Sequence, residues 1–150
     1  MAEPNMKVIV IAGGGRKAGK TTLAAALADL LPDAQKVKLG EHPPKTGKPP
    51  LPFPLNASYK HVVETVGTPA FLIIESGKIL DDPDLTSDLA IFLPARGHPD
   101  KPGSDRRRAQ CDLIRGEPID EKSFDTLQRK LGVPKDTFHA LLEAAEVPLA

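Results

Sequence analysis

The stretch 13–22 limits more narrowly than any other how this chain can fold. It reads GGGRKAGKTT, and from Gly14 onward it fits the spacing G-x-x-x-x-G-K-[ST]. The apolar, β-branched segment 7–12 before it is typical of a strand buried in a parallel sheet. The segment 22–31 after it is rich in leucine and alanine, and it predicts a helix with one apolar face. The sequence therefore predicts a strand, a glycine-rich loop and a helix in direct succession.

The residue types of this stretch are those of the P-loop, which holds phosphate groups. Glycines let backbone N–H groups approach phosphate oxygens, and the start of a helix adds unpaired N–H groups and the positive end of its dipole. Lys20 is expected to bridge the β- and γ-phosphates of a nucleotide, and the Thr21 hydroxyl is expected to bind Mg²⁺. A turn that only joined a strand to a helix would need neither residue. The predicted nucleotide-binding residues are Gly14, Gly15, Arg16, Lys17, Ala18, Gly19, Lys20, Thr21 and Thr22.

A second strong signal is the apolar segment 69–74, which ends in the acidic residue Glu75. Four large apolar residues in a row predict a buried parallel strand, whose carboxyl end lies at the same edge of the sheet as the glycine-rich loop. In P-loop proteins an acid at this place binds Mg²⁺, directly or through water, or polarises the attacking water. Glu75 is therefore predicted to be a metal ligand together with Thr21, and a catalytic residue together with Lys20. The alternative is an ordinary acidic residue at the end of a strand.

Composition limits the number of domains and the kinds of partner. A chain of 150 residues has room for one compact domain, and its 20 basic and 20 acidic residues leave no net charge that would favour nucleic acid or an anionic membrane. Cys111 is the single cysteine, which excludes an internal disulfide and a multi-cysteine zinc site within one chain. The segment 1–6 lacks the features of a signal peptide, so a cytoplasmic protein is expected.

Strands and helices alternate along the rest of the chain. The pattern predicts an α/β three-layer sandwich with a mainly parallel sheet of about five strands and helices on both faces. Further strands are expected at 34–39, 87–95 and 111–116, and a helix is expected up to Val66. Residues 1–117 would form the core of a single nucleotide-binding domain.

The segment 118–150 has a different character and predicts a C-terminal helical extension. Asp120 can cap a helix that ends at Gly132, and Pro134 suits the first turn of a second helix through Ala145. These two helices could cover the sheet, reach a second subunit or recognise a partner.

Three segments leave their role open. Glu41 and His42 are expected at the same edge of the sheet as the glycine-rich loop, where they could orient a water molecule or stay solvated. The segment 43–54 contains six prolines in twelve residues, which excludes a central strand and predicts an extended loop that covers a ligand or docks a partner. The run 106–108 of three arginines could stabilise a transferred phosphoryl group, or it could form the solvated face of a short helix.

Several of these features together resemble the molybdopterin-guanine dinucleotide biosynthesis protein B (MobB) family. The likeness rests on the strand and loop of 7–23, a second strand ending near a histidine, the helix start at 58–61 and the apolar strand ending in Glu75, and it covers about half of the chain. It implies a small dimeric P-loop protein that binds guanine nucleotide and assists maturation of the molybdenum cofactor. The residues carried over are Gly14, Gly19, Lys20, Thr21 and Thr22 at phosphate and Mg²⁺, with Glu75 as the acidic partner. The chain departs from the family where His42 leads into prolines and where Ser76 follows Glu75.

Three functions are consistent with the sequence. The first is a nucleotide-dependent accessory protein for cofactor assembly, in which slow hydrolysis switches a homodimer or the interface with a protein partner. The second is a small-molecule kinase in which an arginine of the run 106–108 acts from a lid. The third is a regulatory module that binds nucleotide without turnover. The segment 95–105 lacks the Asn/Thr-Lys-x-Asp pattern of common GTPases, so the choice between GTP and ATP stays open.

Overall fold

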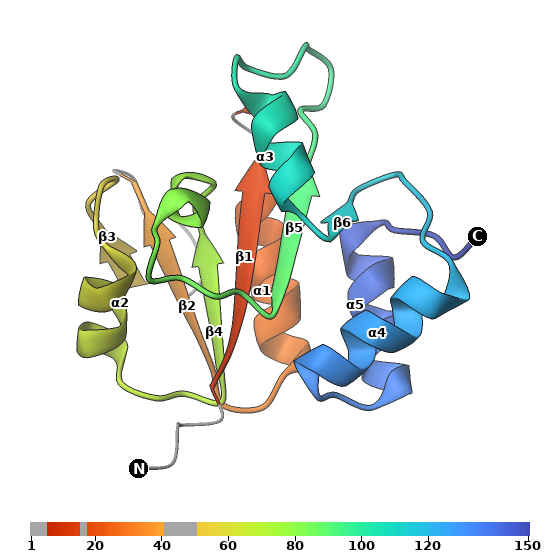
Figure 1. The fold of residues 1–150 in the computed structure, drawn as a ribbon, viewed down its shortest axis with the longest axis horizontal. Helices are drawn as coiled ribbons and strands as arrows, with labels where there is room; N and C mark the ends of the chain where they lie inside the picture. The colour runs from red at the N-terminus through yellow and green to blue at the C-terminus, as the bar shows by residue number, and fades with distance from the viewer. Residues whose placement is uncertain (1–5, 16–17, 41–50) are drawn as a thin grey trace.

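The computed structural model describes residues 6–15, 18–40 and 51–150, in which strands and helices alternate (Figure 1). The strands are β1 (Lys7–Gly13), β2 (Ala34–Leu39), β3 (Leu51–Phe53), β4 (Phe71–Glu75), β5 (Leu89–Leu93) and β6 (Leu113–Ile114). The helices are α1 (Lys20–Leu30), α2 (Tyr59–Val66), α3 (Ser104–Gln110), α4 (Glu121–Leu131) and α5 (Lys135–Ala145), with a 3-10 turn η1 (Lys78–Asp81) after β4.

The strands form one sheet in which every paired neighbour is parallel, in the order β3-β2-β4-β1-β5-β6. The predicted α/β class with a parallel sheet is confirmed, but the sheet has six strands instead of about five. The additional strand, β3, comes from the proline-rich segment. It contains Pro52 and lies at the edge of the sheet, where a residue without an N–H group does not interrupt a ladder on both sides. The rest of that segment, 43–50, lies outside the described residues, as do Glu41 and His42.

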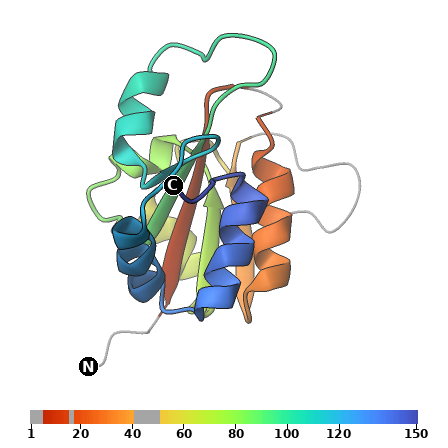
Figure 2. The same cartoon turned by 90° about the vertical axis from the view of Figure 1, so that its right-hand side faces the viewer.

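The two faces of the sheet are covered by different helices because side chains alternate along each strand. On β1, Ile9 and Ile11 pack in a core with α1, α4 and α5, whereas Val8 and Val10 pack in a second core with α2. Figure 2 shows α1 and α5 side by side on one face, with α3 on the other. The arrangement is the three-layer sandwich that the sequence predicts.

The two C-terminal helices cover the sheet, which is the first of the three alternatives that the sequence leaves open. Phe124 of α4 and Phe138 of α5 are buried, and their rings meet edge to face with centroids 5.1 Å apart. Both belong to the same core as Ile9 and Leu27. Asp120 caps α4 as predicted, since its side chain accepts a hydrogen bond from the Ser123 backbone N–H. The helices therefore share the hydrophobic core of residues 1–117.

The backbone at Gly132 lets the chain turn from α4 into α5. Its φ of +75° lies in the left-handed region, which costs an L-residue with a β-carbon roughly 1–2 kcal/mol. A β-carbon there would meet only the end of the Lys7 side chain, at 3.5 Å, so strain and not crowding decides the effect of a substitution. We expect Gly132→Ala to lower the free energy of unfolding by roughly 1–2 kcal/mol in urea denaturation. The matched variant Gly132→Asn should lose less, because asparagine tolerates this conformation, and equal losses would contradict this explanation.

The strand order places a crevice at the carboxyl end of β1. From β1 the chain passes through α1 to β2, which lies on one side of β1 in the strand order. From β4 it passes to β5, and from β5 to β6, which lie on the opposite side of β1. In open α/β sheets ligands bind where the direction of the connections reverses in this way. This end of the sheet is uppermost in Figure 1, below the loop that leads into α3. Among the described residues, every helix is too short or too polar to cross a membrane.

Candidate functional site

The glycine-rich loop connects the carboxyl end of β1 to the first turn of α1. Gly19 has a φ of +97°, and its carbonyl accepts the first helical hydrogen bond, from the Leu23 N–H. The Lys20 side chain folds back over Gly13, so that a β-carbon on Gly13 would lie 3.1 Å from Lys20 Cδ. The loop therefore needs glycine at 13 for the path of the lysine and at 19 for the backbone. Arg16 and Lys17, two of the predicted nucleotide-binding residues, lie outside the described residues.

The structure brings the two predicted metal ligands into contact. Glu75 pairs with Ile11 across the β1–β4 ladder, which places its side chain beside the start of α1. The Thr21 Oγ1 hydroxyl donates a hydrogen bond of 2.8 Å to Glu75 Oε1. Glu75 is only 2% exposed, and within the part of the chain that the structure describes its Oε2 has no hydrogen-bond partner. A buried carboxylate oxygen without a partner is costly, and a bound cation would remove that cost.

The charges of Lys20 and Glu75 are both held in an unfavourable environment. Burial raises the pKa of Glu75 above its ordinary value, although the hydrogen bond from Thr21 and the charges of Lys38 and Lys20 act in the opposite direction. Burial also lowers the pKa of Lys20 and the nearby Lys101 lowers it further, whereas the charge of Glu75 acts in the opposite direction. A polyanion beside Lys20 and a cation beside Glu75 would add to the opposite charge that each group already has nearby and would offset the cost of burial.

The oxygen atoms of Thr21 and Glu75 suit a magnesium ion that is completed by other ligands. Mg²⁺ prefers oxygen and commonly takes one or two protein ligands together with water and substrate phosphates. Residues 6–15, 18–40 and 51–150 contain no group of three or more His, Cys, Asp or Glu that could hold a metal ion. The residues present therefore fit a shared protein–phosphate site and do not form a closed protein cage.

The loop 94–103, which follows β5, lies against the glycine-rich loop. The Gly14 N–H donates to the Leu93 carbonyl at 2.9 Å, and the Gly14 carbonyl accepts from the Lys101 N–H at 2.7 Å. Asp100 Oδ1 accepts a hydrogen bond from the Ala95 N–H at 2.6 Å, directly beside Gly14. No sequence motif marks these contacts, because they depend on how the loop after β5 returns over β1.

The close approach of Asp100 gives Gly14 a packing role in addition to any role in binding. A β-carbon at residue 14 would lie 2.1 Å from Asp100 Oδ1 and 3.1 Å from the Ala95 backbone nitrogen. Gly14→Ala should force the carboxylate away from the Ala95 N–H, and we expect it to lower the free energy of unfolding by about 1–3 kcal/mol. In a double-mutant cycle measured by urea denaturation, Asp100→Ala should recover part of that loss. Strictly additive losses would show that the two residues do not compete for the same space.

Arg115, directly after β6, fastens the two loops to each other. One terminal nitrogen of its guanidinium donates to the Ala18 carbonyl in the glycine-rich loop, and the other donates to the Pro94 carbonyl after β5. Arg115 is not among the site residues predicted from the sequence. It could have been anticipated, because it follows a short apolar strand in the same way that Glu75 ends one.

The three arginines of the run 106–108 have different surroundings. Arg106 and Arg107 both donate hydrogen bonds to the carboxylate of Asp81, each at 2.8 Å. Arg108 instead pairs with Glu117 at 2.6 Å, and its guanidinium lies 5.3 Å from the centre of the Phe92 ring. The three arginines therefore do not share one environment, and a lid role stays a prediction. Arg106 and Arg107 line a cavity that also contains Lys20 and Glu75, whereas Arg108 has a packing role.

Cys111 lies between α3 and β6 and is half-buried against the core on the α2 side of the sheet. Burial and the neighbouring Asp112 raise the pKa of its thiol to about 12. The thiol is therefore protonated at neutral pH and packs as a small apolar group.

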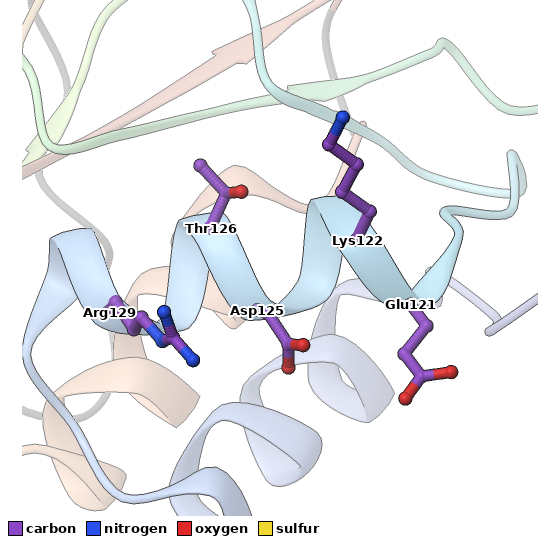
Figure 3. Close-up of a pocket in the computed structure, with 5 residues that line it drawn as sticks. All are labelled: Glu121, Lys122, Asp125, Thr126 and Arg129. Atoms are coloured by element: carbon purple, nitrogen blue, oxygen red, sulfur yellow. The ribbon is translucent and has the colours of Figure 1, made fainter.

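The cavity beside the glycine-rich loop measures about 390 Å³, and a larger hollow of about 750 Å³ lies on α4. Figure 3 shows that the side chains around the α4 hollow diverge: Lys122 and Thr126 point to one side of the helix, and Glu121 and Asp125 point to the other. Together with Arg129 the hollow has two acidic and two basic side chains, and they do not converge on a common point. The smaller cavity, which contains Lys20 and Glu75, is the candidate site.

Comparisons of the chain with protein-family models, with curated proteins and with solved structures found no match.

Proposed function

We propose that this chain is a P-loop protein that binds and slowly hydrolyses a magnesium-bound nucleoside triphosphate, GTP or ATP. The observation that carries the proposal is the contact between Thr21 and the buried Glu75 carboxylate beside Lys20. A structural strand end has no reason to bury an acid with one oxygen unpartnered, whereas a site for Mg²⁺ and phosphate does.

Each part of the site has a separate task in this proposal. The backbone N–H groups of Gly15 and residues 18–22 would surround the phosphates, with Gly14 giving the turn that brings them close, and the Lys20 ammonium would contact the β- and γ-phosphate oxygens. Thr21 and Glu75 hold the metal ion, which when bound supplies positive charge against the phosphates. Glu75 also orients the attacking water and accepts its proton.

A thermal-shift panel of ATP, GTP, ADP and GDP, each with and without Mg²⁺, tests the proposal. A ligand that binds only the native state stabilises it by about 2.7 kcal/mol at a concentration of 100 times its dissociation constant. We expect at least one triphosphate to raise the melting temperature, and to raise it more with Mg²⁺ than without. Equal responses to guanine and adenine nucleotides would show that the base is not read. If no nucleotide raises the melting temperature, nucleotide binding is excluded at the concentrations used.

The cellular role that we propose is that of an accessory protein in cofactor maturation. The support is the resemblance of residues 7–77 to the MobB family, which extends to a homodimer or a protein partner and to the molybdenum cofactor as the client. Release of phosphate without any added acceptor would support this role.

A small-molecule kinase is the second candidate, and one observation favours it. Arg106 and Arg107 line the same cavity as Lys20 and Glu75, where a phosphoryl acceptor would lie. Phosphate release that occurs only when an acceptor is added would favour the kinase over the accessory protein.

A further inference from the structure

The cavity beside Lys20 extends well beyond the residues that the proposed nucleotide site uses. One end is formed by Gly13, Lys20 and Glu75, at the carboxyl ends of β1 and β4. The other end is formed by side chains from η1 and α3, among them Lys78 and Arg106. The glycine-rich loop and its proposed nucleotide would occupy only the first end, so the second end is free to bind another group.

The second end is close to the first because Arg107 lies along the chain that follows Glu75. A β-carbon on Gly77 would be 3.3 Å from Arg107 Cδ and from Arg107 Nε, so the arginine crosses this glycine. Its side chain is 19% exposed and its far nitrogen donates to Asp81. The Arg107 side chain is thereby held in a defined position against Gly77, which is two residues after the predicted metal ligand Glu75.

Positive charge dominates the walls of this cavity. Its described lining contains six basic side chains, Lys20, Lys38, Lys78, Lys101, Arg106 and Arg107. The acidic side chains in the same lining are Glu75 and Asp81. The repulsion between Lys20 and Lys101, which contributes to the lowered pKa of Lys20, shows that the positive charges act on one another.

The size and lining of the cavity limit what could fill it. A volume of about 390 Å³ suits a small metabolite, and no aromatic ring is present among the described lining residues to stack on a base. Arginine presents a planar fork of donors that matches phosphate oxygens, and two such forks from α3 share the single carboxylate of Asp81. Asp81 is ionised at any pH near neutrality, because the hydrogen bonds from Arg107 and Gln110 lower its pKa to about 2. One carboxylate neutralises only one of the two guanidinium groups, so a net positive charge remains that an anionic ligand could balance.

We propose that this cavity binds a second, small ligand that carries a phosphate monoester, with its phosphate at Arg106, Arg107 and Lys78 and its other end facing Lys20 and Glu75. The proposal rests on the proposed function only in placing this ligand beside the terminal phosphate of a nucleotide. The anion-binding groups are side chains of α3 and η1, so they are distinct from the backbone N–H groups of the glycine-rich loop.

Calorimetric titration of the full chain with glycerol 3-phosphate tests the proposal. The titration is made with Mg²⁺ and a saturating non-hydrolysable triphosphate analogue, which keeps the probe off the glycine-rich loop, and glycerol serves as the uncharged control. We expect binding of glycerol 3-phosphate with a dissociation constant below about 1 mM, and none of glycerol. The Arg106→Ala/Arg107→Ala variant should bind the probe at least tenfold more weakly, because each lost arginine removes a charge-assisted hydrogen bond.

Two further variants keep the test decisive. Lys78→Glu reverses a charge at an exposed position of the same cavity and should weaken probe binding by at least tenfold without disturbing the core, even if the double arginine variant fails to fold. Arg129→Ala removes an exposed arginine on α4, outside the cavity, and should change nothing (Figure 3). No binding of the probe by the wild type, or unchanged affinity in the Lys78→Glu variant, would overturn the proposal.

The failure of this proposal can be told apart from failure of the proposed function. If the nucleotide analogue binds and glycerol 3-phosphate does not, only the second ligand is refuted. If the analogue does not bind but the probe binds in a way that depends on Arg106, Arg107 and Lys78, the nucleotide proposal fails and the anion cavity stands. Probe binding that is unaffected by these residues would place the phosphate elsewhere and refute the cavity.

Discussion

Replacing Lys20 with alanine should weaken the binding of magnesium-bound nucleotide by roughly 100-fold and abolish its thermal shift. The ammonium group lies at the start of α1, folded over Gly13, where it can make charge-assisted hydrogen bonds to phosphate oxygens. Each such bond is worth about 1.5–3 kcal/mol, and the net loss of one of them accounts for a change of roughly 100-fold. Equilibrium titration with a fluorescent nucleotide analogue measures the affinity directly.

The ligand-free Lys20→Ala protein should be no less stable than the wild type. Burial and Lys101 lower the pKa of Lys20 by more than Glu75 raises it, so on balance alanine removes a charge that the native state holds at a cost. Lys122→Ala, on the exposed face of α4, is the matched control and should change neither quantity. Unchanged nucleotide affinity in Lys20→Ala would refute the proposed function.

Replacing Glu75 with glutamine should slow nucleotide hydrolysis by about 100-fold or more while making the ligand-free protein more stable. The amide can still accept the hydrogen bond from Thr21 Oγ1, but it cannot accept a proton from water and is a much poorer ligand for Mg²⁺. In the wild type the carboxylate is buried and Oε2 has no partner among the described residues, so removal of this charge should stabilise the fold by about 1–3 kcal/mol at pH 8. Urea denaturation and a phosphate-release assay give the two quantities.

The stability gain of Glu75→Gln should depend on pH in a defined direction. The pKa of Glu75 in the native protein lies above its ordinary value of 4.5, so between these two values the native state holds more protons than the unfolded chain. The wild type therefore loses stability as the pH rises through that window, and stays less stable above it. The difference between the variant and the wild type should be small below about pH 4.5 and largest above the native pKa. Glu143→Gln, exposed on α5, should show no such difference, and a gain independent of pH would argue against a buried charge at Glu75.

Local sequence patterns predict much of this fold because the apolar positions that form the patterns are the residues that the fold buries. The strand 34–39 and the end of the buried strand at Glu75 are found at the predicted residues, and Gly67 and Gly132 end their helices as expected. The contact between Thr21 and Glu75 could also be anticipated, since the carboxyl ends of parallel strands meet at one edge of a sheet. The predicted strands at 87–95 and 111–116 are shorter in the structure, at Leu89–Leu93 and Leu113–Ile114. Pro134 precedes the first residue of α5 instead of lying in its first turn.

The remaining features depend on strand order, which local pattern does not contain. Arg115 reaches the glycine-rich loop only because β6 pairs with β5. Arg107 and Arg108 are adjacent in the sequence, yet Arg107 meets Asp81 after β4, whereas Arg108 meets Glu117 after β6. The same residue type therefore lines the cavity at one position and packs on Phe92 at the next. Neither composition nor periodicity distinguishes the roles of Arg107 and Arg108, which follow only from their tertiary contacts.

The hydrogen bond from the Lys101 N–H to the Gly14 carbonyl joins the two segments of backbone that hold the two proposed ligands. Lys101 is three residues before the start of α3, and α3 carries Arg106 and Arg107. A nucleotide that shifts Gly14 would thus also shift the helix that holds the phosphate monoester. Coupling free energies between two binding sites are reciprocal, so the factor by which nucleotide changes the affinity for the monoester would equal the factor by which the monoester changes the affinity for nucleotide.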